Sequence, residues 1–153
     1  MWAIAINPTS GHGKGASFGQ LVIEYFARHK IAYQIFSGDS AERLRKDLDS
    51  ELETNSYEGV ISVGGDGLAH LILQLCVPRQ TPFAVMPAGT GNDIVRTLGW
   101  SLDDIESYLD RVTRTEAAPI DLGNVDSEWF AAILSTGFDS IVNERANALS
   151  WPK

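Results

Sequence analysis

Uncharged apolar runs alternate with amphipathic stretches along the N-terminal part of the chain. The strand-like runs occupy residues 2–7, 31–36, 59–63 and 83–87. The stretches between and after them have apolar residues at helical spacing, and they occupy residues 17–30, 40–52, 68–76, 92–99 and 101–112, with Ser101 and Asp104 resembling an N-cap pair. This order predicts an α/β domain with a parallel, Rossmann-like sheet over residues 1–114.

The pattern changes after Arg114. Residues 116–126 and 127–139 resemble two longer strands that join near Asp126 and Ser127, and residues 140–150 resemble a helix. No helix separates the two strands, which is typical of an antiparallel pair. We therefore expect residues 115–153 to begin a second, β-rich domain, and we expect its unpaired strand edges to promote homo-oligomers.

Composition and charge narrow the class of protein. The chain has 153 residues, 44% of them hydrophobic, and a net charge of −8, so it can bury a core but lacks the basic face of a nucleic-acid-binding protein. The single cysteine, Cys76, lies in an apolar run and favours a reducing, cytoplasmic setting. No run approaches the roughly 18 apolar residues of a membrane span, and the first residues do not resemble a signal peptide.

Glycine-rich segments follow the strand-like runs. They read NPTSGHGKG at 7–15, GGDG at 64–67 and PAGTGND at 87–93, and a shorter SGD stands at 37–39. Parallel strands end at one edge of a sheet, where such folds bind their ligands. We therefore expect a crevice lined with backbone N–H groups that binds the phosphates of a nucleotide.

Each segment also has a simpler interpretation. Residues 7–15 suit an ordinary loop, Asp66 suits a helix cap, and Asn92 with Asp93 suits the cap of the next helix. A carboxylate about 4 Å from a phosphate charge is repelled by roughly 4 kcal/mol at an effective dielectric near 20. If phosphate binds beside Asp66, this acid must therefore be offset by Mg²⁺ or must orient a proton-bearing group.

A Rossmann dinucleotide-binding protein is one alternative. Gly11, Gly13 and Ala16 match the dinucleotide fingerprint loosely. That class needs an acid at the end of the second strand, where this chain has Ser37 followed by Asp39 two residues on, and it has no use for GGDG.

In order, spacing and identity, NPTSG, GGDG and PAGTGND resemble the catalytic domain of the diacylglycerol kinase family, with bacterial lipid kinases nearest and sphingosine and ceramide kinases as relatives. PIDLG at 119–123 and STGFD at 135–139 are similar to the same family, so the resemblance covers nearly the whole chain. It implies a phosphofructokinase-like nucleotide-binding domain followed by the first strands of a truncated β-sandwich domain. NAD kinases share GGDG in another context and are a less favoured alternative.

The resemblance implies transfer of the γ-phosphoryl group of ATP to a lipid hydroxyl, such as that of diacylglycerol, with Mg²⁺ and with peripheral contact to a membrane. It implies catalytic roles for Asp66 and for Asp121, the latter tied to the Mg²⁺ and water network. It identifies no certain metal ligand in this chain. The ATP contacts that it implies are Asn7, Pro8, Thr9, Ser10, Gly11, Ser37, Gly64, Gly65, Asp66, Gly67, Leu68, Ala69, His70 and Thr90.

Two departures qualify this expectation. Leu68 stands where the family usually has the threonine of GGDGT. Family members are also longer, and their general base and main Mg²⁺ ligands are expected beyond Lys153. We therefore expect the chain to be the nucleotide-binding half of a lipid kinase, inactive on its own, with a non-catalytic nucleotide-binding module as the alternative.

Overall fold

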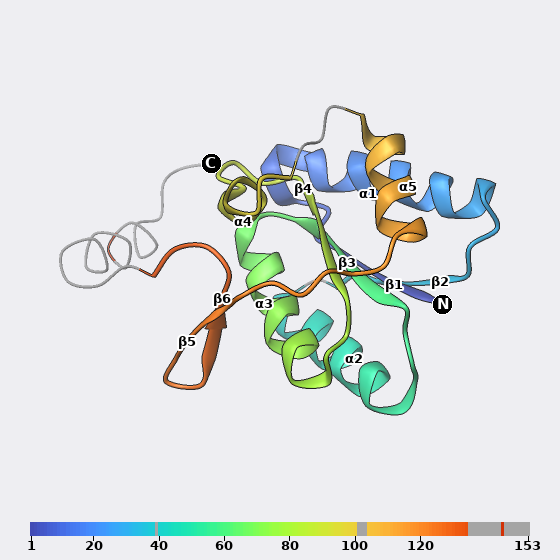
Figure 1. The fold of residues 1–153 in the computed structure, drawn as a ribbon. Helices are drawn as coiled ribbons and strands as arrows, with labels where there is room; N and C mark the ends of the chain where they lie inside the picture. The colour runs from blue at the N-terminus through green and yellow to red at the C-terminus, as the bar shows by residue number, and fades with distance from the viewer. Residues whose placement is uncertain (39, 101–103, 135–144, 146–153) are drawn as a thin grey trace.

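A parallel sheet forms the centre of the protein (Figure 1). The computed structural model describes residues 1–38, 40–100, 104–134 and 145. Within them, the strands of this sheet lie in the order β2-β1-β3-β4. Their bounds are β1 Trp2–Ile6, β2 Tyr33–Phe36, β3 Gly59–Gly64 and β4 Phe83–Pro87. The predicted α/β fold is confirmed, and the observed strands match the predicted runs closely.

Helices cover both faces of the sheet (Figure 1). Helices α1 (Ser10–Arg28) and α5 (Ile105–Arg114) lie on one face, and α2 (Ala41–Thr54) and α3 (Asp66–Cys76) lie on the other. The short helix α4 (Asp93–Thr97) follows β4, and a 3-10 turn, η1 (Val77–Arg79), follows α3. The three layers explain why β1 and β3 are buried along their whole length.

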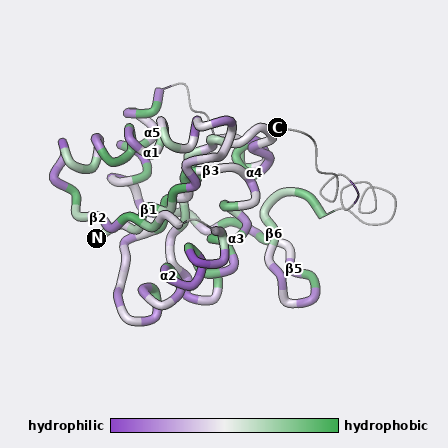
Figure 2. The backbone as a smooth tube through the Cα atoms, turned by 180° about the vertical axis from the view of Figure 1, so that it is seen from behind, coloured by the Kyte–Doolittle hydropathy of each residue, from purple (hydrophilic) through white to green (hydrophobic). Residues whose placement is uncertain are grey.

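Alternation along β1 divides the core between the two faces. Trp2, Ile4 and Ile6 pack with side chains of α1 and α5, whereas Ala3 and Ala5 pack with side chains of α2 and α3. Hydrophobic residues are concentrated on the central strands, and the outer turns of α2 are hydrophilic (Figure 2). Helices therefore pack against both faces of the central strands.

The start of α5 differs from its prediction. This helix begins at Ile105, and Asp104 is its N-cap, because the Asp104 carboxylate accepts a hydrogen bond from the Ser107 N–H at 2.9 Å. The predicted pairing with Ser101 is therefore wrong for Asp104, and Ser101 itself lies outside the described residues. A short acidic side chain at the N-cap stabilises the start of a helix because it accepts a hydrogen bond from an otherwise free N–H group of the first turn.

The predicted pair of longer strands is only partly present. An antiparallel hairpin joins β5 (Gly123–Val125) to β6 (Glu128–Phe130) through Asp126 and Ser127, which have φ angles of 47° and 70°. The predicted turn is correct and has the left-handed backbone of a two-residue hairpin loop. The strands are shorter than predicted because residues 115–122 have no strand of the described chain beside them. Residues 135–139 and the predicted helix at 140–150 lie outside the described residues, apart from Arg145.

Candidate functional site

The three glycine segments meet at the carboxyl edge of the sheet. The parallel register aligns Ile6 with Val63 and Gly64 with Pro87, so β1, β3 and β4 end together. A Cβ atom on Gly89 would lie 2.6 Å from the Cα atom of Gly65. A Cβ atom on Gly11 would overlap the carbonyl oxygen of Ala88. The predicted convergence is therefore present, and these glycines let one backbone pack directly on another.

The first segment is a tight left-handed turn rather than a flexible loop. The Asn7 Oδ1 atom accepts hydrogen bonds from the backbone N–H and the hydroxyl of Thr9, at 3.2 and 2.9 Å. Gly11, His12 and Gly13 then have φ angles of 57°, 59° and 93°, and the right-handed part of α1 follows. Only glycine adopts such angles without cost, which explains two of the three glycines here.

The second segment places two of the predicted contacts in the core. Helix α3 begins at Asp66, earlier than predicted, and it buries Leu68 and Ala69, which are 8% and 0% exposed. The Leu68 side chain packs against Gly64. The departure from GGDGT is therefore a change in a buried side chain, which lies under Gly64 instead of presenting a hydroxyl to solvent. Gly67 is exposed, and apart from its chain neighbours and the backbone of α3 no described atom lies within 4 Å of the Cβ position at this residue.

Asp66 connects the second segment to the third. Its Oδ1 atom accepts a hydrogen bond from the backbone N–H of Ile94 at 3.2 Å, so it satisfies the first turn of α4 rather than its own helix. A Cβ atom on Gly91 would lie 3.0 Å from Asp66 Oδ2 and 3.4 Å from Asp93 Oδ2. Two carboxylates therefore flank Gly91, where the three glycine segments meet.

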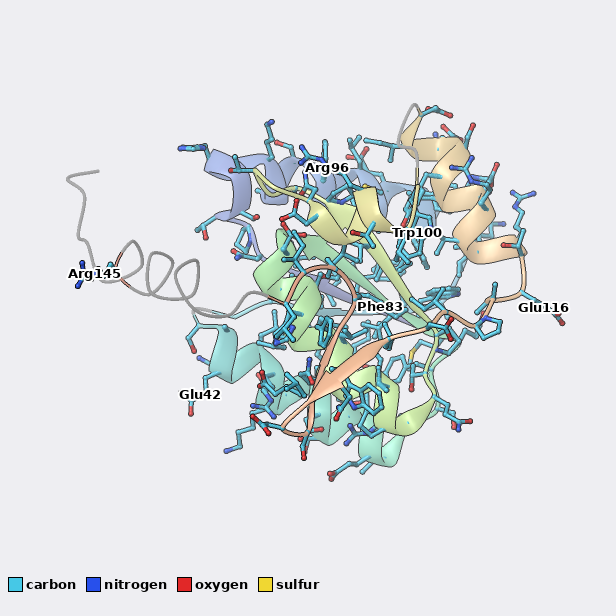
Figure 3. All side chains as sticks on the ribbon, turned by 60° about the vertical axis from the view of Figure 1, so that its left-hand side comes forward. Glu42, Phe83, Arg96, Trp100, Glu116 and Arg145 are labelled. Carbon is cyan, nitrogen blue, oxygen red and sulfur yellow. The ribbon has the colours of Figure 1, made fainter. Side chains whose placement is uncertain are left out.

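Asp93 is a candidate site residue that the sequence interpretation did not assign. The sequence suggested a capping role, yet its carboxylate lies beside that of Asp66 and 3.6 Å from the guanidinium of Arg96. Arg96 lies on α4 (Figure 3). The available signal was that an acid follows each of two adjacent strands, β3 and β4, within a glycine-rich segment.

Asn92 has a different partner from the predicted one. It occupies the N-cap position of α4, with φ 56°, but its side chain does not cap that helix. Its Oδ1 atom accepts a hydrogen bond from the Gly89 N–H, and its Nδ2 group donates one to the Gly89 carbonyl, both at 3.0 Å. Asn92 therefore closes the third segment on itself and leaves Thr90 exposed at the tip.

The remaining predicted site residues lie on several different elements. Ser37 is exposed and follows β2 at the same edge, since Phe36 pairs with Ala5 of β1. His70 faces the hairpin, with Nε2 3.7 Å from the Glu128 carboxylate. Asp121 is exposed in the segment that leads to β5, and its neighbours Ile120 and Leu122 line a cavity beside β4 that includes none of the glycine segments. Asn7, Pro8, Thr9, Ser10, Gly11, Gly64, Gly65, Asp66, Gly67 and Thr90 all belong to the three converging segments.

A separate cavity lies beside β4 and does not include the glycine segments. Its volume is about 1270 Å³, and its lining includes Trp2, Phe83, Trp100 and Tyr108. Phe83 and Trp100 are labelled in Figure 3. The Tyr108 hydroxyl donates a 2.8 Å hydrogen bond to the Val85 carbonyl, and burial raises the pKa of Tyr108 to about 12. Tyr108 therefore satisfies one carbonyl of the strand at the edge of the sheet.

Burial raises the pKa of the Cys76 thiol to about 12, so the predicted structural role of this cysteine is retained and a thiolate nucleophile is disfavoured. In the part of the chain that the structure describes, no cluster of three or more His, Cys, Asp or Glu side chains could hold a metal ion. No described helix has the length and apolar character needed to cross a membrane.

Comparisons with known proteins agree with the geometry. The family model of the diacylglycerol kinase catalytic domain matches residues 1–125. A diacylglycerol kinase of Mycobacterium tuberculosis (strain ATCC 25618 / H37Rv) is 32% identical over 152 residues, which cover 95% of this chain and 48% of that protein. A diacylglycerol kinase of Bacillus subtilis (strain 168) is 33% identical over 89 residues, which cover 57% of this chain and 29% of that protein.

The fold is also similar to solved structures. A diacylglycerol kinase from Bacillus anthracis str. Sterne has a TM-score of 0.69 and 22% identity, covering 84% of this chain and 45% of that chain. The chain spans about half the length of the mycobacterial relative, since the match covers 48% of that protein. The family model matches most of the chain. The chain therefore belongs to the diacylglycerol kinase catalytic-domain family.

Proposed function

We propose that this chain binds ATP and forms the nucleotide-binding part of a lipid kinase, which transfers the γ-phosphoryl group to a lipid hydroxyl such as that of diacylglycerol. The observation that carries the proposal is the convergence of three glycine segments at one edge of the sheet. Phosphoryl transfer depends mainly on positioning and charge stabilisation, and backbone N–H groups supply both for a polyphosphate.

The open positions of the cluster define the proposed phosphate site. Pro8, Thr9, Gly67 and Thr90 are exposed. Of the other glycines of these segments, Gly11, Gly15, Gly65 and Gly89 lie close to neighbouring backbone, Gly64 and Gly91 face side chains, and Gly13 is open. We assign ATP contacts to the exposed residues first. Leu68 and Ala69 are not assigned ATP contacts, because their side chains are buried and their backbone N–H groups already donate to the Gly65 carbonyl, both at 3.1 Å.

Mg²⁺ fits the same place. This ion usually binds one or two carboxylates together with substrate phosphates, and Asp66 and Asp93 both flank Gly91. These two residues would hold the ion, which would neutralise phosphate charge. One oxygen of Asp66 already accepts the Ile94 N–H, so Asp66 would offer its other oxygen. Asp121 would approach from the β-rich segment, and its proposed catalytic role depends on how that segment is placed.

Calorimetric titration tests nucleotide binding directly. ATP with Mg²⁺ is expected to bind, ATP without Mg²⁺ to bind more weakly, and NAD not to bind. Preferential binding of NAD would refute the proposal and favour a dinucleotide-binding protein.

Lipid phosphorylation is the second test. Radiolabelled ATP and micellar diacylglycerol are expected to give labelled lipid with the complete polypeptide and none with residues 1–153 alone. ATP binding without any labelled lipid in the complete polypeptide would favour a non-catalytic nucleotide-binding module.

We also propose that the β-rich segment after Arg114 begins a second domain. The hairpin of β5 and β6 is a sheet of its own, which supports this division. A cytoplasmic enzyme with peripheral contact to the membrane would meet both ATP and its lipid. Limited proteolysis is expected to cut within residues 115–122, and cleavage inside α1 or α3 instead would contradict the division.

A further inference from the structure

The hairpin turns one residue's backbone toward helix α3. Its register pairs Val125 with Glu128 and Asn124 with Trp129 around the two-residue turn. In such a hairpin the pair next to the turn is hydrogen-bonded, so the next pair directs its N–H and C=O groups away from the partner strand. Both main-chain polar groups of Trp129 therefore lie on the outer edge of β6.

Gln74 of α3 satisfies both of these groups. Its Nε2 group donates a 2.8 Å hydrogen bond to the Trp129 carbonyl, and its Oε1 atom accepts a 3.0 Å bond from the Trp129 N–H. The Nε2 group also donates to the His70 carbonyl at 3.2 Å, on its own helix. A glutamine amide has two donor hydrogens and an acceptor oxygen, so this side chain acts as the peptide group of one more strand.

Further contacts join the hairpin to the same helix. His70 Nε2 lies 3.7 Å from the Glu128 carboxylate. Ala131 and Ala132 pack against the cluster of Ala69, Val85, Ile94 and Val95. Figure 1 shows the hairpin beside α3. Among the polar contacts of the described hairpin with α3, the Gln74 pair alone uses two aligned hydrogen bonds to one residue.

We infer that Gln74 is a positioning residue, which holds the β-rich segment in place relative to the carboxylates of the glycine segments. Gln74 lies roughly 12 Å from Asp66 along α3, at 1.5 Å per residue. Asp121 lies just before β5, whose Asn124 pairs with Trp129. The position of Asp121 relative to Asp66 therefore depends on the Gln74 amide, which joins α3 to the hairpin. The catalytic consequence of this inference rests on the proposed function. The two hydrogen bonds between Gln74 and Trp129, which we call the clamp, do not depend on it.

The structural test compares two variants that have the same new side chain. Gln74→Met keeps an unbranched chain and helix propensity but removes both bonds to Trp129. Gln20→Met is the matched control, because Gln20 is exposed on α1 and its amide bonds only Glu24 in the next turn. In hydrogen exchange followed by NMR, the Trp129 N–H is expected to exchange about tenfold faster than in the wild type in Gln74→Met and at the wild-type rate in Gln20→Met.

The buried N–H groups of β3 control for unfolding in the same spectra. If β3 stays protected and Trp129 exchanges at the wild-type rate in Gln74→Met, the clamp is refuted. If β3 also loses protection, the ratio of the Trp129 exchange rate to the β3 exchange rates still decides. A ratio higher than in the wild type supports the clamp, and an unchanged ratio refutes it.

The kinetic test addresses positioning in the complete, lipid-phosphorylating polypeptide. Gln74→Met is expected to lower kcat about tenfold to a hundredfold while KM for ATP stays the same, because the glycine segments are untouched. Wild-type kcat in Gln74→Met, or a raised KM with kcat preserved, would overturn the positioning role. A wild-type protein that does not bind ATP would refute the proposed function instead, and the exchange result would still decide the clamp.

Discussion

Two glycines at the same edge of the sheet have opposite surroundings, and replacing each with alanine separates packing from ligand binding. Gly11 has φ 57° and faces the Ala88 carbonyl, which a methyl group would overlap. Gly67 lies in the first turn of α3, where no atom of another described element lies within 4 Å of the added carbon. Both belong to the proposed phosphate site, so only their roles in packing differ.

The expected changes in the free energy of unfolding have opposite signs. For Gly11→Ala, the left-handed backbone costs about 1–2 kcal/mol and the overlap with backbone costs about 1–3 kcal/mol, so the loss is about 2–5 kcal/mol. For Gly67→Ala, alanine gains up to about 1 kcal/mol from helix propensity and meets no neighbour. The difference between the two variants is therefore several times larger than the error of an unfolding curve.

Urea unfolding followed by circular dichroism measures the stability of both variants, and calorimetric titration measures ATP binding. Gly67→Ala is expected to be at least as stable as the wild type but to bind ATP about tenfold to a hundredfold more weakly, because a methyl group would displace a phosphate that accepts hydrogen bonds from this turn. Gly11→Ala is expected to lose stability whether or not nucleotide is present.

Two results would refute this reasoning. Wild-type stability of Gly11→Ala would mean that the close approach of the first and third segments does not stabilise the fold. Wild-type ATP affinity of Gly67→Ala would mean that phosphate does not approach the start of α3. Weaker binding in a fully folded Gly67→Ala protein is the outcome that packing alone does not predict.

Three further predictions concern the chemistry of the fold. Asp66→Asn keeps an oxygen acceptor for α4, so it is expected to fold normally but to lower lipid phosphorylation about 10²–10⁴-fold. Asp66→Ala should lower phosphorylation as well and should also lose about 1–3 kcal/mol of stability. Wild-type activity in both variants would contradict a catalytic role. Burial raises the pKa of Tyr108 from 10.0 and that of Cys76 from 9.0 to about 12, so their contribution to stability is complete below about pH 9 and is lost as pH rises toward 12. Tyr108→Phe should therefore flatten the decline of the unfolding free energy at alkaline pH. An unchanged slope would argue against this role of Tyr108. Ile133 is 68% exposed beside the hairpin, so Ile133→Ser should reduce self-association in sedimentation velocity, and a strictly monomeric wild type at high concentration would refute the association.

Local pattern was sufficient for the architecture. Hydrophobic periodicity identified the strands and helices of the sheet because each element is specified by residues adjacent in sequence, and parallel order then required β1, β3 and β4 to end at one edge. The convergence of the glycine segments and the placement of Asp66 followed from that order alone. The turn at Asp126 and Ser127 was also predictable, since a hairpin turn is a local structure.

Only the tertiary structure decided which groups those segments bring into contact. Asp66 bonds Ile94, Asn92 bonds Gly89 instead of capping α4, and Leu68 turns into the core. Gln74 and Trp129 meet although 55 residues separate them in the chain. Such contacts depend on how separate loops and helices cross in space, and no local preference encodes that crossing. The sequence by itself therefore determined the fold and the edge at which the glycine segments meet, and the packing of distant backbones decided which partner each polar side chain at that edge bonds.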